Sequence, residues 1–255
     1  MVETLKKYQF LFEELVKRDF KKKYKRTVLG MGWSILSPLL MLLVLYLVFG
    51  SFFGRYTEHY TIYLFSGNLL YSYFNDSTTG GMRSLLSNAH IFTKVTVPKY
   101  MFLLARSVQS LINFGLSLVV YFIFVIFDDV SFHWGFIMLI YPIVCITVFN
   151  IGFGLILSIL YVFFRDMDYL YGIFTMVVMY GSAIFYTITH FDPMFQKLFY
   201  LNPVFVYITY FREIVVNGII PSIGLHLLCF FYAFAAMVIG CWMYKKYNQQ
   251  ILYYV

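Results

Sequence analysis

Long stretches without charged side chains restrict the fold of this sequence more than any other feature. Five of them contain no Asp, Glu, Lys or Arg, and a sixth contains only Glu58 and Asp76; they cover residues 27–54, 56–82, 107–127, 130–164, 169–191 and 214–244. Each is long enough for a helix that crosses the bilayer, which takes about 20 apolar residues. Charged residues make up 12% of the chain, against about 25% in soluble domains, which argues against a water-soluble enzyme. The sequence predicts an all-α polytopic membrane protein with six transmembrane helices.

The basic residues are unevenly distributed between the two sides of these predicted spans. Most of the 19 Lys and Arg residues lie in residues 1–26 and 83–106, at Arg165, or at residues 245–246. Six spans would bring all of these segments to one side of the membrane. Because cytoplasmic loops are enriched in Lys and Arg, we predict that both termini are cytoplasmic.

Two segments outside the spans have patterns of their own. Residues 1–26 are basic, with apolar residues at helical spacing, which predicts an amphipathic interface helix beside the anionic headgroups of membrane lipids. Residues 187–221 contain two proline-led starts and an uncharged run, 198–211, that is too short to cross the bilayer. We predict short re-entrant outer helices here that border a pathway, because non-spanning backbone in the membrane must be buried or line a cavity.

The predicted inner loop, residues 84–99, mixes apolar side chains with Lys94 and Lys99. A loop that only joins two helices needs no apolar cluster. A short helix here would either dock a cytoplasmic protein or pack beneath the bundle, and the residues leave both alternatives open.

Motifs for catalysis, nucleotide binding and metal binding are missing from the sequence. It contains no G-x-x-x-x-G-K-[ST] phosphate loop, no H-E-x-x-H and no Cys/His cluster at metal-ligand spacing. We therefore expect no catalytic residue, no metal and no cofactor in this chain, and no nucleic-acid partner. Asp76 is the one acid well inside a predicted span, and we expect it to be a structural or pathway-facing group with Asn75, Ser77 and Thr78 as hydrogen-bond partners.

Aromatic residues make up 22% of the chain, including 24 Tyr. Most would face lipid or pack in the bundle, as aromatic residues commonly do in membrane proteins. Tyr also combines an apolar face with a hydroxyl group, so some of these side chains could line a path along which a sugar polymer slides. The candidates for this path are Trp33, Tyr71, Tyr73, Phe74, Asp76, Phe185 and Tyr186.

Four stretches together resemble one family of transporters. They are RDFKKKYKRTVLGMGWSILSPL, SGNLLYSYFNDSTTGGMRSLLSNAHIFTKVTVPKY, YVFFRDMDYL and LNPVFVYITYFREIV. The chain is similar to type-2 ABC transporter permeases of the polysaccharide-export group (Wzm/TarG-like), which move O-antigen, capsular or teichoic-acid polymers. It departs from many relatives at Tyr71 and at Val97-Pro98-Lys99, which limits any statement about the polymer.

The resemblance implies a transport subunit in a bacterial plasma membrane. Residues 27–255 would form the permease domain, and two copies would pair as a homodimer around a lipid-linked polysaccharide. Two separate cytoplasmic ATPase subunits would bind ATP and Mg. Residues 85–96 resemble the coupling helix that docks the ATPase, and residues 187–221 the outer gate segment. The implied coupling residues are Asn88, His90, Ile91, Phe92 and Lys94, and the implied gate residues are Arg165, Asp166, Arg212 and Glu213.

Two alternatives use the same residues differently. A permease of the same architecture could export a small lipid or a drug, and the neighbouring genes would distinguish the two. A membrane-embedded enzyme acting on lipid-linked sugars would need clustered acids, for which Asp76, Asp166 and Asp168 are the candidates.

Overall fold

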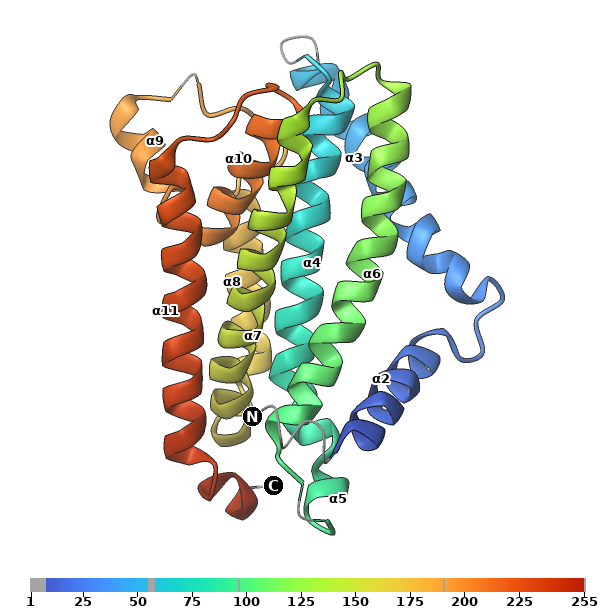
Figure 1. The fold of residues 1–255 in the computed structure, drawn as a ribbon, viewed down its shortest axis with the longest axis vertical. Coiled ribbons are helices and arrows are strands. Elements are labelled where there is room, and N and C mark those ends of the chain that lie inside the picture. Colours follow the sequence, from blue (N-terminus) through green and yellow to red (C-terminus); the bar gives the residue numbers. More distant parts are fainter. Residues whose placement is uncertain (1–7, 55–57, 96, 190, 255) are drawn as a thin grey trace.

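The computed structural model describes residues 8–54, 58–95, 97–189 and 191–254, with the side chains of residues 22–24 and 31 left out. Every regular element in these ranges is a helix (Figure 1). The α-helices are α2 (Gln9–Tyr24), α3 (Trp33–Phe53), α4 (Tyr60–Ser87), α5 (Ala89–Phe92), α6 (Tyr100–Phe127), α7 (Ile140–Phe163), α8 (Met167–Tyr180), α9 (Pro193–Phe199), α10 (Pro203–Val215) and α11 (Ile223–Tyr247). Short 3-10 turns, η1 (Gly30–Gly32), η2 (Trp134–Leu139) and η3 (Gln250–Tyr253), precede α3, precede α7 and follow α11.

Four helices of the described chain are long and apolar enough to cross a membrane: α3, α6, α7 with η2, and α11. They match four of the six predicted spans. The other two predicted spans hold α4 and α8. Helix α4 has 28 residues but is markedly more polar, and α8 has only 14, or about 21 Å of helix against a hydrocarbon core of about 30 Å.

Helix α4 can be polar because it lies at the centre of the bundle (Figure 1). It packs against α6 and α7 along most of its length and also contacts α3 and α10. Most of its side chains are buried, so they face protein. Helix α3, by contrast, is apolar and largely exposed, as expected for a helix surrounded by lipid.

Glycines bring the backbones of neighbouring helices close together. A Cβ atom added to Gly152 of α7 would lie 2.5 Å from the Ala236 carbonyl carbon of α11. One added to Gly81 of α4 would lie 3.2 Å from the Cα atom of Gly154 in α7. Small residues at such crossings allow the close van der Waals packing that holds helices together in membranes.

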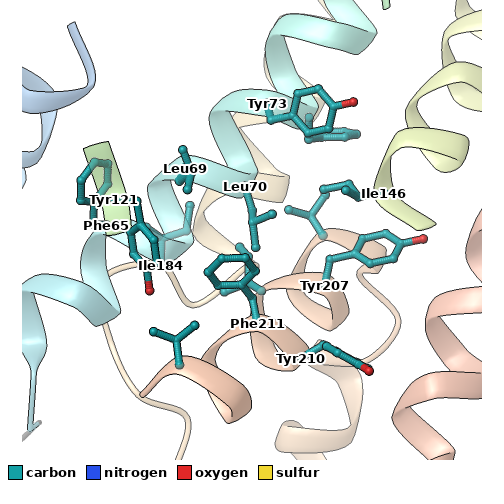
Figure 2. Close-up of a cluster of buried hydrophobic side chains, with 14 of the residues drawn as sticks. Phe65, Leu69, Leu70, Tyr73, Tyr121, Ile146, Ile184, Tyr207, Tyr210 and Phe211 are labelled. Atoms are coloured by element: carbon teal, nitrogen blue, oxygen red, sulfur yellow. The ribbon is translucent and has the colours of Figure 1, made fainter. Parts of the chain in front are cut away.

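The apolar core lies where α4, α6, α7 and α10 meet (Figure 2). Aromatic rings fill much of it, and Tyr121, Tyr207 and Phe211 are fully buried. Their edge-on contacts include Tyr121 with Phe65, whose ring centroids are 5.4 Å apart. Much of the aromatic surplus therefore serves packing.

The elements predicted on one side of the membrane gather at one end of the bundle. Helices α2 and α5 and the turn η3 lie at this end, and α9 lies at the other (Figure 1). Leu15 of α2 is buried in a small cluster with Phe92 and Ile251, so the apolar face of α2 packs on protein. Burial of Lys99 in the same region lowers the pKa of its ammonium group, which donates to the Asn248 carbonyl.

Candidate functional site

Two adjoining cavities form a polar groove along α4, within the depth of the apolar helices. The first, of about 400 Å³, lies between α3, α4 and α6. The second, of about 660 Å³, continues between α4, α6 and α2. Ser72 and Asp76 line both cavities. We call the two together the polar groove.

Regular spacing of polar residues on two helices produces this groove. On α4, the lining residues include Asn68, Ser72, Asn75, Asp76, Thr79 and Arg83. On α6, they include Arg106, Gln109, Ser110, Asn113 and Ser117. Side chains three or four positions apart share one face of a helix, so each helix presents a polar stripe, and the two stripes face each other across the groove.

An ion pair lies at the junction of the two cavities. Arg106 Nη2 of α6 is 2.9 Å from Asp76 Oδ1 of α4, and Ser110 Oγ donates to Asp76 Oδ2 at 2.7 Å. The side chains of Arg106 and Asp76 remain 24% and 35% exposed. Asp76 therefore lines both cavities, and whether they form a pathway stays a prediction. The predicted hydrogen-bond partners Asn75, Ser77 and Thr78 were wrong, because the carboxylate turns toward α6.

Hydrogen bonds continue from this ion pair to the predicted docking loop. Arg106 donates to Gln109 Oε1, and Gln109 Nε2 donates to the Asp19 carbonyl of α2 at 3.0 Å. Arg18 Nη2 is 2.7 Å from both Asp19 Oδ1 and Asn88 Oδ1. The groove, α2 and the residue that precedes α5 are therefore joined by direct contacts.

The two predicted inner gate residues, Arg165 and Asp166, do not pair with each other. Arg165 is exposed and donates to the Tyr254 carbonyl at 3.4 Å, while Asp166 is exposed at the start of α8. A nearby ion pair instead joins Arg83 Nη2 to Asp168 Oδ1 at 2.7 Å. It ties the C-terminal part of α4 to α8, and it was not predicted.

The predicted coupling residues divide into two groups. Residue 96 of the predicted range 85–96 lies outside the described residues. Within the described part, 85–95, only Ala89–Phe92 forms a separate helix, and residues 85–87 still belong to α4. His90 and Lys94 are exposed. Asn88 and Phe92 are buried, and Ile91 is partly buried against the cluster of Leu15 and Phe92. Of these residues, His90 and Lys94 are therefore the ones available to another protein.

Three of the seven predicted path residues line the groove: Trp33, Tyr73 and Asp76. Phe74 and Phe185 are enclosed in the core, with 1% and 5% of their surface exposed. The hydroxyls of Tyr71 and Tyr186 donate to the carbonyls of Thr175 and Tyr180. These four residues line neither cavity and hold the bundle together.

Arg212 was expected near the outer surface beside Glu213, but it is 6% exposed. Its guanidinium donates to the carbonyls of Tyr63 at 2.9 Å, Ala183 at 2.9 Å and Ile184 at 3.0 Å. It also lies 3.4 Å from the centre of the Tyr63 ring. Arg212 is buried because α10 folds back into the bundle. The side chain of Asn202 caps the first turn of this helix by accepting a hydrogen bond from Val204 N.

The two proline-led helices of the outer segment form as predicted. Asp192 caps α9 and Asn202 caps α10, and a proline occupies the first turn of each. This is the preferred arrangement at helix starts. Among the described residues, no group of three or more His, Cys, Asp or Glu side chains is placed to hold a metal ion.

Comparison with known proteins identifies the family. The model of the ABC-2 type transporter family matches residues 11–216, which include α3, α4, α6 and the groove between them. The chain belongs to the ABC-2 type transporter family. Two Klebsiella pneumoniae proteins, each named O-antigen export system permease protein RfbA, are 27% identical to it over 93% of both chains. A Myxococcus xanthus protein of the same name is 31% identical over 46% of this chain and 45% of its own length.

Family membership confirms the predicted resemblance and makes this chain a multi-pass transporter subunit. The sequence indicated Asp76 but missed its partners Arg106 and Ser110. Arg106 was taken for a loop residue, because the predicted span began at residue 107, whereas α6 begins at Tyr100. The helical spacing of Arg106, Gln109, Asn113 and Ser117 was the signal that could have found this side of the groove.

Proposed function

We propose that this ABC-2 family chain is the permease of an exporter that moves a lipid-linked polysaccharide of the O-antigen type across the bacterial plasma membrane. The names of the Klebsiella and Myxococcus relatives support this substrate. The observation that carries the proposal is the polar groove, in which hydroxyl and amide side chains line a path between apolar helices.

Six spans follow if α4 and α8 cross the membrane beside the four apolar helices. Helix α4 runs the length of the bundle (Figure 1), and its polar side chains need no lipid contact because its neighbours cover it. Helix α8 is short and packs on α7 and α4 along one face, and the turn that follows it is buried and bound by Arg212. Both termini are then cytoplasmic, in keeping with the basic residues at the end that holds α2 and α5.

The groove supplies binding groups suited to sugars. Ser, Thr and Asn side chains can each donate and accept hydrogen bonds with sugar hydroxyls. Trp33, which is 41% exposed at the rim, offers an apolar ring face for stacking. Because these groups repeat along two helices, successive sugars meet similar partners, so a polymer can move stepwise without a single tight site.

The energy for this movement comes from ATP and Mg bound by a separate ATPase. Two ATPase subunits would dock at the end of the bundle that holds α2 and α5, where His90 and Lys94 are exposed. Two copies of the permease would pair so that the groove of each contributes to one conduit. We also propose that Arg165, Asp166 and Glu213 act at the gates of the conduit, and that Arg212 holds the segment beside Glu213 in place.

The test uses the permease with its ATPase in proteoliposomes that contain an undecaprenyl-diphosphate-linked polysaccharide. Ser72→Phe places a ring where the two cavities meet, and we expect it to reduce ATP-driven export at least about tenfold, because the ring blocks the groove. Val238→Phe adds the same ring on an exposed face of α11 and should leave export near that of the unmodified protein. Equal export by both variants would exclude the groove as the path.

A further inference from the structure

The charged side chains of the polar groove balance one another. Among the described residues that line its two cavities, the cations are Arg83 and Arg106 and the acids are Asp19 and Asp76. Arg106 pairs with Asp76 at 2.9 Å. Asp19 pairs with Arg18 at 2.7 Å at the rim.

The remaining lining cation is neutralised from outside the cavity. Arg83 Nη2 contacts both carboxylate oxygens of Asp168, at 2.7 and 3.0 Å. Two contacts from one guanidinium fix the side chain more firmly than a single hydrogen bond does. No described cation that lines the groove is therefore left without an acid.

The first cavity, between α3, α4 and α6, is still less suited to an anion. Its one charged lining residue among those described is Asp76. The other polar groups there are hydroxyls and amides, including Ser37, Asn68, Ser72 and Ser117. Because Arg106 already pairs with Asp76, an anionic sugar passing this point would lose water without gaining a free cation, which is unfavourable in a partly desolvated space. Uncharged sugar hydroxyls meet no such barrier.

This balance contrasts with the charge of the whole chain, which is +7. Among the described residues in and around α2, the exposed cations line neither cavity; they are Lys17, Arg18, Lys21, Lys25 and Arg26. They suit the lipid-linked diphosphate and anionic headgroups at the membrane surface. The surface and the groove therefore favour different parts of one substrate.

We propose that the polar groove selects an uncharged polysaccharide and discriminates against a polyanion, such as a polymer of uronic acids or of phosphodiester-linked units. This inference rests on the proposed function, because it assigns a substrate class to the same groove. The anionic diphosphate would bind at the basic surface around α2, and the neutral chain would enter the groove.

The test compares two substrates on the permease with its ATPase in proteoliposomes. Both are undecaprenyl-diphosphate-linked polymers of equal length, one of neutral hexoses and one with a glucuronic acid in every repeat. The measured quantity is the ratio of their ATP-driven export rates. We expect the unmodified protein to favour the neutral polymer by about tenfold, because each anionic sugar would lose hydration without a free cation to replace it.

Ser72 allows the groove charge to be changed without breaking an ion pair, because it is exposed in both cavities. Ser72→Lys should move the ratio toward the anionic polymer by about fivefold or more, and Ser72→Asp should move it the opposite way. Ser72→Asn is the uncharged control and should keep the ratio of the unmodified protein. Asp76→Asn, which frees Arg106 from its acid, should move the ratio in the same direction as Ser72→Lys.

The outcomes separate this inference from the proposed function. Export of neither polymer by the unmodified protein would overturn the proposed function and this inference with it. Equal export of both, with ratios unmoved by Ser72→Lys and Ser72→Asp, would overturn the selectivity and leave the exporter standing. A ratio that moves in opposite directions in the two charged variants would establish the groove as the selective element.

Discussion

Two arginines lie within the bundle of this protein, and their surroundings differ in almost every respect. Arg106 lines a cavity, keeps 24% of its side chain exposed and faces the carboxylate of Asp76. Arg212 is 6% exposed and binds three backbone carbonyls instead of an acid. One cation therefore borders an open cavity, and the other lies in a packed joint.

The difference separates a site that can exchange partners from one that cannot. The Arg106 ion pair borders open volume, so water or a sugar hydroxyl can replace part of it at little cost. Arg212 crosslinks α10, α4 and the turn after α8, and its loss would remove several hydrogen bonds to a charged group from a buried site. We assign transport to the first environment and rigidity of the end of the bundle that holds α10 to the second. The predictions that follow test this division.

Removing Arg212 should have the largest effect on stability. Arg212→Ala removes the hydrogen bonds that a buried cation donates to the carbonyls of Tyr63, Ala183 and Ile184, and we expect the free energy of unfolding to fall by about 3 kcal/mol or more. The free energy of unfolding of Arg212→Lys should lie between those of Arg212→Ala and the unmodified protein, because one ammonium group cannot reach all three carbonyls. Thermal unfolding in detergent measures both, and an unchanged transition in Arg212→Ala would show that the joint is not stabilising.

Crowding the same guanidinium should have the next largest effect. A Cβ atom on Gly67 would lie 2.5 Å from Arg212 Nη2, so Gly67→Ala must displace the cation and should cost about 1–3 kcal/mol of stability. Gly115→Ala on α6 is the matched control, since its Cβ atom meets nothing within 4 Å. Similar unfolding temperatures for the two variants would contradict the tight fit around Arg212.

Neutralising Asp76 should change transport more than stability. Asp76→Asn removes the acid that faces Arg106, but a partly hydrated ion pair contributes only about 0–1 kcal/mol. We expect an unfolding temperature close to that of the unmodified protein, together with altered polymer-stimulated ATPase activity of the complex. A loss of stability as large as that of Arg212→Ala would place the two arginines in the same structural role.

Cysteine labelling should distinguish the two regions with the smallest perturbation. In a Cys241→Ala background, Ser72→Cys places a thiol in the groove, and Ser66→Cys places one beside Arg212, where Ser66 is fully buried. The native Cys145 and Cys229 are buried. A water-soluble maleimide should react readily at position 72 and very slowly at position 66. Equal rates would mean that water reaches both regions alike.

Much of the architecture could be predicted from the sequence, because the bilayer imposes length and composition on helices that face lipid. Helices α3, α6, α7 and α11 follow this constraint and match their predicted spans. The starts of α9 and α10 were also predicted correctly, because each depends on only two adjacent residues, a capping Asp or Asn followed by Pro.

The candidate site was harder to predict, because its residues depend on contacts between helices. Arg106 and Arg212 both lie at the edges of apolar stretches, where a charge usually marks the membrane surface. Helix α6 extends beyond its uncharged run, which carries Arg106 into the bundle, and α10 folds inward, which buries Arg212. Phe92 and Phe185 were expected at functional surfaces, but they pack in the protein, since aromatic side chains serve both purposes.

Substrate protection of the groove tests the central claim most directly. The Ser72→Cys permease, assembled with its ATPase in proteoliposomes, is labelled with the maleimide in the presence and absence of a neutral undecaprenyl-diphosphate-linked polysaccharide. If the polymer occupies the groove, labelling at position 72 slows at least about fivefold when polymer is present. An unchanged labelling rate, under conditions in which the same polymer stimulates ATP hydrolysis, would contradict the assignment of this groove as the transport path.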